Sequence, residues 1–186
     1  KNAISPELSE FLYNYLILKR TVAKTFYDSD YTIPSEIIGR WGDAQVPDTY
    51  CFYSDIAIET LMLKQAPIME KVVGESLFPT YTYGRIYKKG DVLEIHKDRP
   101  ACEISTTIFL GEDKWDIYIE PDVRIELNVG DMLVYSGADL AHWREPFLGE
   151  NCVQIFLHYN RTASGFGSLY DSKSQPGLPE SFKGAL

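Results

Sequence analysis

The chain changes character at Pro79, and this change limits the folds open to it more than any other feature of the sequence. Beyond it, short segments rich in Tyr, Ile, Val, Thr and Phe alternate with turn-forming residues, a pattern typical of β-strands. Many short strands at regular spacing favour a sandwich or barrel over a βαβ sheet. The expected strands cover residues 80–88, 92–97, 102–110, 115–120, 123–127, 131–136, 140–144 and 152–159.

The part of the chain before Pro79 has a helical pattern instead. Ser5 followed by Pro6 is typical of a helix N-terminus, and apolar residues then recur near helical spacing over 8–26. A second helix is predicted from Ser54 or Asp55 to about residue 74, with a kink or a break at Pro67. Helices first and strands later is an α+β order, in which the helices buttress one outer face of the sheets.

These patterns predict a single domain over residues 1–186. Its parts are a helical support over 1–78, a β core over 79–161 and an irregular tail over 162–186, rich in Ser, Gly and Pro. A turn-rich loop at about 28–47 joins the two helices.

Composition excludes several classes of function. The net charge of −9 and the pI of about 4.8 argue against general nucleic-acid binding, which needs a basic surface. No apolar run approaches the roughly 20 residues needed to cross a bilayer, and no signal-peptide pattern is present.

The three widely spaced cysteines resemble neither a disulfide framework nor a zinc site, so we expect reduced, buried thiols in a cytoplasmic protein.

The three histidines of the chain include one pair with metal-binding potential. His96 and Asp98 are two residues apart, so a strand end would present them on the same face. His142 follows on a later predicted strand. Two imidazoles and one carboxylate on one side of a metal leave its other side open, as in non-haem iron(II) oxygenases. We therefore predict that these three residues hold a metal and are catalytic; the alternative for His96 is a strand histidine paired with Asp98.

The segment from Tyr83 to Asn160 resembles the core of the 2-oxoglutarate-dependent dioxygenases, specifically their prolyl-4-hydroxylase-like branch. The matching residues are Arg85-Ile86-Tyr87, Gly90, His96-Lys97-Asp98, Ser105–Leu110, Val129–Tyr135, His142, Pro146 and Val153–Tyr159. The resemblance implies a double-stranded β-helix (jelly roll) that uses Fe(II), 2-oxoglutarate and O₂ and releases succinate and CO₂. It assigns the three metal-ligand positions to His96, Asp98 and His142, and the branch also suggests L-ascorbate.

One feature departs from the family pattern. The family usually has Arg or Lys about ten positions after the second ligand histidine, to pair with the distal carboxylate of 2-oxoglutarate, but residues 150–154 contain no cation. Arg144 is the nearest candidate, and strand alternation places it on the same face as His142. A salt bridge, for example with Glu145, is the alternative for Arg144. Tyr87 and Thr107 are further candidates for binding 2-oxoglutarate, with packing or an ordinary hydrogen bond as the alternative.

Other polar and aromatic residues carry weaker predictions. His158 is expected to be a core histidine or one that supports the site, not a metal ligand. Tyr83 and Arg85 either pack in the core or lie at a substrate entrance.

The leading functional hypothesis is a 2-oxoglutarate-dependent hydroxylase acting on a small molecule or a peptide, with a prolyl residue or a free amino acid as the first guess. A cupin-like metal enzyme that does not use 2-oxoglutarate is an alternative, favoured by the missing Arg or Lys. A non-catalytic jelly-roll binding module is the third. The sequence does not predict an oligomeric state.

Overall fold

The computed structural model describes residues 1–31 and 38–164, so most of the predicted tail lies outside the described part. Within these two ranges there are two long helices and two antiparallel sheets, which confirms the α+β class. In chain order the elements are α1 (Pro6–Asp28), β1 (Tyr50–Tyr53), α2 (Ile56–Val73), β2 (Leu77–Lys88), β3 (Leu93–His96), the 3₁₀ helix η1 (Pro100–Cys102), β4 (Ile104–Glu112), β5 (Ile117–Ile119), β6 (Val123–Ile125), β7 (Met132–Tyr135), β8 (His142–Arg144) and β9 (Asn151–Arg161).

Both helices begin where their capping residues predict. The Ser5 side chain accepts a hydrogen bond from the backbone N–H of Leu8 at 3.2 Å, and Asp55 caps α2 in the same way. A kink or a break was expected at Pro67, and of these two alternatives the break does not occur, because α2 runs through Pro67 as one helix. Met62 and Met69, on either side of the proline, are fully buried, and their packing holds the helix together there. No helix in the described ranges is both long and apolar enough to cross a membrane.

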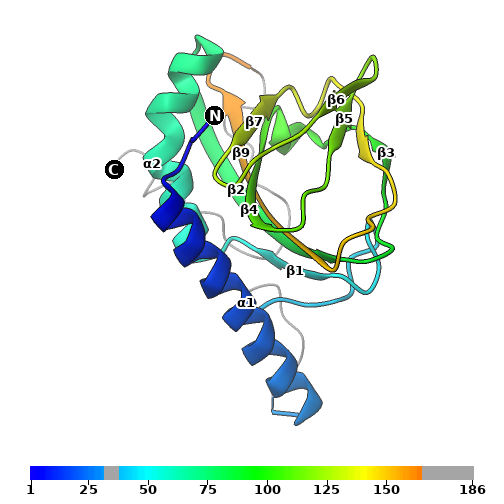
Figure 1. Cartoon of the computed structure of the whole chain (residues 1–186). Helices are drawn as coiled ribbons and strands as arrows, with labels where there is room; N and C mark the ends of the chain where they lie inside the picture. The colour runs from blue at the N-terminus through cyan, green and yellow to red at the C-terminus, as the bar shows by residue number, and fades with distance from the viewer. Residues whose placement is uncertain (32–37, 165–186) are drawn as a thin grey trace.

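The two sheets face each other, and the helices cover the outer side of the larger one (Figure 1). The larger sheet has the order β1-β2-β9-β4-β7, and the smaller has the order β3-β8-β5-β6. The main hydrophobic core lies between the helices and the larger sheet, where Leu16 and Met62 meet Ile108 and Ile155. The helices therefore support one face of this sheet and leave its other face turned toward the smaller sheet.

Strand β1 was not predicted from the sequence. All four of its residues are buried, so it shows no alternation of polar and apolar positions. It pairs with β2 in the register Tyr53↔Tyr83 and extends the larger sheet by one strand.

Candidate metal and cosubstrate site

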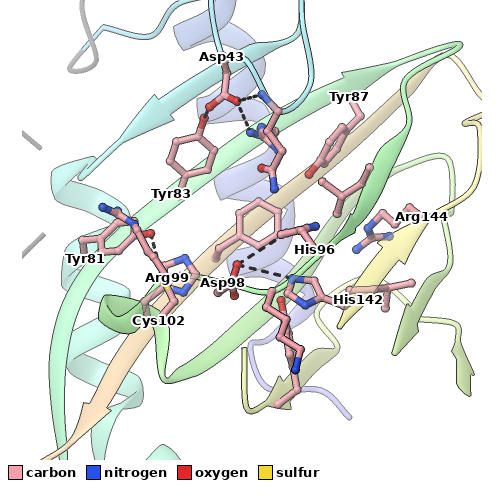
Figure 2. Close-up of a pocket in the computed structure, with 18 residues that line it drawn as sticks. Asp43, Tyr81, Tyr83, Tyr87, His96, Asp98, Arg99, Cys102, His142 and Arg144 are labelled. Atoms are coloured by element: carbon pink, nitrogen blue, oxygen red, sulfur yellow. Dashed lines mark hydrogen bonds and ion pairs between the residues drawn. The ribbon is translucent and has the colours of Figure 1, made fainter. Parts of the chain in front are cut away.

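A cavity of about 240 Å³ lies between the facing sides of the two sheets, and Figure 2 shows its lining residues. Alternate residues of β2 form one wall, and the ends of β3 and β8 form the opposite wall. The residues that line it are Asp43, Gln45, Tyr81, Tyr83, Arg85, Tyr87, Leu93, His96, Lys97, Asp98, Arg99, Cys102, Ile117, Tyr135, His142, Arg144, Phe156 and His158.

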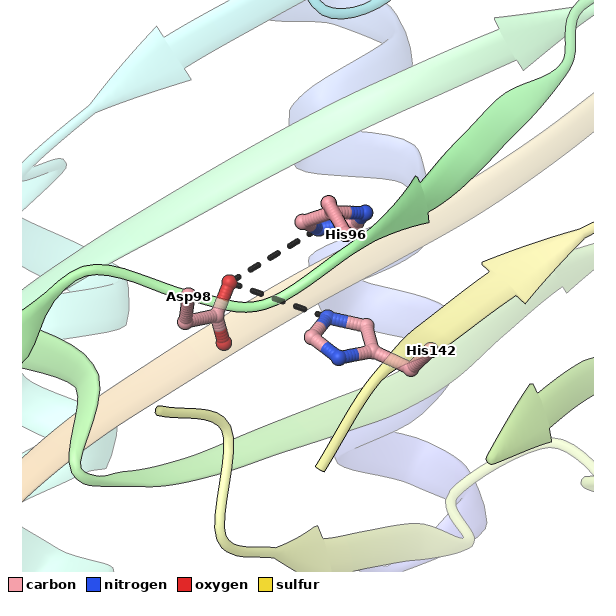
Figure 3. Close-up of side chains that lie close together, drawn as sticks. All are labelled: His96, Asp98 and His142. Atoms are coloured by element: carbon pink, nitrogen blue, oxygen red, sulfur yellow. Dashed lines mark ion pairs between the residues drawn. The ribbon is translucent and has the colours of Figure 1, made fainter. Parts of the chain in front are cut away.

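His96, Asp98 and His142 come together in this cavity (Figure 3). The two histidines are register partners in the antiparallel pair of β3 and β8, which places their rings 4.2 Å apart between centroids. Oδ1 of Asp98 lies 3.8 Å from Nε2 of His96 and 3.6 Å from Nε2 of His142. The potential ligand atoms of the three residues all lie within 4.8 Å of one another, a spacing that one metal ion can bridge with small side-chain adjustments.

Hydrogen bonds to the backbone fix the orientation of both imidazoles. Nδ1 of His96 lies 2.7 Å from the carbonyl oxygen of Glu94, and Nδ1 of His142 lies 3.0 Å from that of Leu140. A carbonyl only accepts, so each ring carries a proton on Nδ1, and Nε2 is the ring nitrogen that faces Asp98. Burial also lowers the pKa of His142, despite the opposing effect of Asp98, which favours the neutral imidazole that a metal requires.

The Asp98 carboxylate is held by groups outside the histidine pair. Its Oδ2 accepts a hydrogen bond from the Ser105 hydroxyl at 2.6 Å, and its backbone N–H donates to the carbonyl of Gly137 at 2.8 Å. Ser105 in turn lies 3.1 Å from Nδ1 of His158. His158 therefore lies beside Ser105 in the cavity wall and supports the site indirectly, although it is also close enough to Asp98 and Cys102 to form a second group of potential ligands.

Arg144 follows His142 on β8 by two residues, and it lines the same cavity as strand alternation predicts. Its side chain is almost fully buried, with 1% of the residue exposed. The guanidinium donates to the carbonyl of Trp115 and lies 3.5 Å from Thr107 Oγ1, while its Nε has no hydrogen-bond partner. Among the described residues no carboxylate forms an ion pair with it, including Glu145.

Arg144 is also close enough to residue 152 to act on its charge. Residue 152, ten positions after His142, is the buried thiol Cys152. Burial raises the pKa of Cys152, and the nearby Arg144 guanidinium acts in the opposite direction. The positive charge near Cys152 of β9 is thus that of Arg144, which belongs to β8.

Tyr87 and Thr107 lie differently with respect to the cavity. Tyr87 lines it, and its hydroxyl is buried without a hydrogen-bond partner. Burial raises the pKa of Tyr87, so the phenol remains a donor for an acceptor placed in the cavity. Thr107 does not line the cavity; its hydroxyl donates to Oε1 of Gln154 at 2.8 Å and lies behind Arg144.

Tyr83 and Arg85, expected either in the core or at a substrate entrance, line the cavity, whereas sequence reasoning missed their common partner, Asp43. Arg85 is 3% exposed and forms an ion pair with Asp43 at 2.8 Å, and the Tyr83 hydroxyl donates to the other oxygen of Asp43 at 2.5 Å. Asp43 lies in the turn-rich loop, and no sequence pattern there indicates that it contacts residues of β2. Arg99 was also missed, although its place next to Asp98 could have suggested it.

Comparison with solved structures shows which fold this is. The sequence matches no family model and no curated protein. A prolyl-4-hydroxylase from Pseudomonas putida superposes with a TM-score of 0.55 over 86% of this chain and 89% of its own, at 11% identity. HygX from Streptomyces hygroscopicus, with nickel, 2-oxoglutarate and hygromycin B bound, superposes with a TM-score of 0.56 over 76% of this chain and 78% of its own, at 15% identity. A 2-oxoglutarate–Fe(II) oxygenase family member from Burkholderia pseudomallei superposes with a TM-score of 0.53 over 61% of this chain and 68% of its own, also at 15% identity.

The chain therefore has the fold that these 2-oxoglutarate–Fe(II) oxygenases share. At identities of 11–15% the superpositions concern the fold alone, and roles for individual residues rest on the geometry of the cavity.

Proposed function

We propose that this protein is an Fe(II)- and 2-oxoglutarate-dependent dioxygenase with a double-stranded β-helix core. In this proposal His96, Asp98 and His142 hold the metal, and Arg144 pairs with the distal carboxylate of 2-oxoglutarate. Tyr87 donates a hydrogen bond to the same cosubstrate, and Thr107 positions Arg144 from behind. The substrate is a small molecule or a peptide, and a prolyl residue or a free amino acid is the class to test first. Residues 1–186 then act as one domain.

The observation that carries this proposal is the pairing of two features in one cavity. One is a set of two imidazoles and a carboxylate that face one another, which suits a divalent metal with open positions. The other is Arg144, a buried cation with no anionic partner among the described residues. An unpaired buried charge is unfavourable, so a site of this kind is suited to an anionic ligand.

The residues have separable tasks in this reaction. When bound, iron with O₂ and 2-oxoglutarate supplies the oxidising power for hydroxylation, with release of succinate and CO₂. The Glu94 and Leu140 carbonyls keep the imidazole protons on Nδ1, and Ser105 keeps Asp98 turned toward the histidines. Arg144 and Tyr87 orient a carboxylate at the other end of the wall. Leu93, Ile117 and Phe156 limit the access of water between the sheets.

The test uses the intact protein under anaerobic conditions. Addition of Fe(II) and 2-oxoglutarate should produce a weak charge-transfer band in the visible range, and admission of O₂ should produce succinate. His96→Ala and Asp98→Ala should abolish both signals while the circular dichroism spectrum stays unchanged. Glu94→Ala is the matched control, because it removes an exposed carboxylate from the same strand.

Each other outcome identifies an alternative. Metal binding with no effect of 2-oxoglutarate would replace this proposal with a cupin-like metal enzyme. Absence of metal binding would leave a non-catalytic binding module. Normal succinate formation by Asp98→Ala would refute the ligand assignment.

A further inference from the structure

Two aromatic side chains of the cavity wall keep part of their surface uncovered. The aromatic residues of the lining are Tyr81, Tyr83, Tyr87, Tyr135 and Phe156. Tyr81, Tyr87 and Tyr135 are buried, with 5%, 0% and 9% of the residue exposed, whereas Tyr83 and Phe156 are only half-buried. Because the two half-buried rings line the cavity, a molecule that enters it can pack against them.

Tyr83 and Phe156 act as one surface because they are opposed in the larger sheet. They are register partners in the antiparallel pair of β2 and β9, and opposed side chains lie on the same face of a sheet. Their ring centroids are 6.3 Å apart, with an angle of 39° between the ring planes. This pair of rings is called the ring platform below.

Contacts of Tyr83 fix the orientation of its ring. The hydroxyl donates to Asp43 at 2.5 Å, and the guanidinium carbon of Arg85 lies 5.1 Å from the ring centroid. A ring that is already fixed loses little freedom when a ligand packs against it. Asp43 and Arg85 form an ion pair with each other at 2.8 Å, so together they offer no net charge to such a ligand. The ring platform therefore suits an uncharged group.

The ring platform and the residues proposed to hold 2-oxoglutarate lie on different sides of the metal ligands. Figure 2 shows Tyr83 on one side of His96 and His142, and Arg144 on the other. Tyr83 and Tyr87 are four residues apart on β2, which corresponds to roughly 13 Å along a strand. A molecule on the ring platform can therefore approach the metal ligands while Arg144 and Tyr87 hold the cosubstrate.

We infer that the substrate carries an uncharged aromatic ring, which packs against the ring platform beside the metal ligands. This inference rests on the function proposed above and narrows its substrate class. Aromatic rings attract one another beyond the burial of apolar area, so the ring platform favours an aromatic ring over a saturated ring of similar size. Among the proposed substrates, this favours a free aromatic amino acid over a prolyl residue, whose ring is saturated.

The experiment uses the whole protein loaded with Mn(II) and stoichiometric 2-oxoglutarate. Mn(II) broadens the NMR signals of nearby protons, so the concentration dependence of the broadening gives an apparent affinity for a probe in the cavity. The probes are benzamide, cyclohexanecarboxamide and acetamide, which share a neutral amide and differ in the group attached to it. We expect benzamide to bind at least about tenfold more tightly than acetamide, and about 2- to 10-fold more tightly than cyclohexanecarboxamide.

Variants of the ring platform assign the preference to its rings. Tyr83→Phe keeps the ring and should retain the preference for benzamide over cyclohexanecarboxamide, whereas Tyr83→Leu should reduce it. Both changes remove the hydrogen bond to Asp43, so the difference between them reports the ring alone. Phe156→Leu should also reduce the preference, and it leaves the contacts of Asp43 intact, so it tests the ring platform even if Tyr83→Leu does not fold. Phe11→Leu is the control, because Phe11 is 62% exposed and lies outside the cavity lining.

The possible failures are distinguishable. If the protein binds Mn(II) and 2-oxoglutarate but binds cyclohexanecarboxamide or acetamide as tightly as benzamide, the inference is wrong and the proposed function stands. The same conclusion follows if Tyr83→Leu and Phe156→Leu both keep the full preference of the unaltered chain. If the unaltered chain does not bind Mn(II) or 2-oxoglutarate, the proposed function fails and this inference fails with it.

Discussion

The Ser105 hydroxyl lies 2.6 Å from Oδ2 of Asp98, on the side of the carboxylate away from His96 and His142. This hydrogen bond determines which oxygen of Asp98 faces the histidines. A carboxylate that loses such a partner can rotate, and its affinity for a metal then falls because the free orientation must be fixed on binding.

We therefore predict that Ser105→Ala lowers the affinity for Mn(II) by about 10- to 100-fold without abolishing it. The change should be measured by titration of Mn(II) with electron paramagnetic resonance, which reports free metal. Thr60→Ala is a suitable control, because it removes a hydroxyl from the exposed surface of α2. An affinity of Ser105→Ala equal to that of the control would show that Asp98 does not depend on this hydrogen bond.

Gly137 provides a second test of the position of Asp98. A Cβ at this residue would lie 2.3 Å from Oδ2 of Asp98 and 2.3 Å from the Ser105 hydroxyl, closer than any real contact. Gly137→Ala should therefore displace the carboxylate and reduce Mn(II) affinity by more than about 100-fold, which is a larger effect than that of Ser105→Ala. Gly42→Ala is the matched control, since nothing lies within 4 Å of the added Cβ. Tight Mn(II) binding by Gly137→Ala would mean that Asp98 is not a ligand.

The metal-ligand candidates could be predicted because they depend on local rules. Two residues of one strand end that are two apart share a face, so His96 and Asp98 were paired from sequence. The approach of His142 depends on the register of β3 and β8, which no local pattern encodes. The resemblance to a known family supplied that step. Alternation also placed Arg144 on the face of His142, and the structure has it there.

The residues that were not predicted are placed by contacts with residues far away in the sequence. Asp43 pairs with Arg85 although β1 and α2 lie between them in the sequence, and nothing near Asp43 in the sequence indicates a buried ion pair. β1 is buried on both faces, so its sequence lacks the alternation of polar and apolar residues by which a strand is recognised. For Thr107, the alternation of residues along the strand predicted the face on which the side chain lies. It did not predict that the hydroxyl donates its hydrogen bond to the Gln154 side chain.

The Asp43–Arg85 ion pair predicts how stability depends on pH. Burial alone would raise the pKa of Asp43, but the Arg85 guanidinium and the Tyr83 hydroxyl outweigh it and lower the pKa to about 2. Because the folded-state pKa lies below the unfolded one, the stabilisation is fully present above about pH 4 and is lost as pH falls through about 2. Asp43→Asn should reduce the free energy of unfolding by about 2 kcal/mol at pH 7.

The measurement is urea unfolding of both proteins at pH 7, 4, 3 and 2. The difference between them should be constant from pH 7 to 4 and should shrink below that. A difference that is the same at pH 2 and pH 7 would show that the charge of Asp43 does not contribute.

Arg144 and Arg85 are both buried arginines of the cavity, but only Arg85 has a carboxylate partner among the described residues. Arg85 is therefore neutralised within the protein, whereas in the proposed function Arg144 pairs with the carboxylate of a ligand. Removing one member of a buried ion pair leaves the other charge uncompensated, whereas removing an unpaired buried charge relieves an unfavourable burial. Arg85→Met should therefore lower the free energy of unfolding by at least the roughly 2 kcal/mol expected for Asp43→Asn.

For Arg144→Met we expect the free energy of unfolding, measured without 2-oxoglutarate, to change by less than about 1 kcal/mol, because the lost hydrogen bond to Trp115 and the relieved charge act in opposite directions. The affinity for 2-oxoglutarate should fall by about 100-fold, since its distal carboxylate loses a charge-assisted partner. Urea unfolding and the 2-oxoglutarate concentration needed for half-maximal succinate formation provide the two measurements. If Arg144→Met were as destabilising as Arg85→Met and left the 2-oxoglutarate requirement unchanged, Arg144 would be a structural residue and the anchor would lie elsewhere.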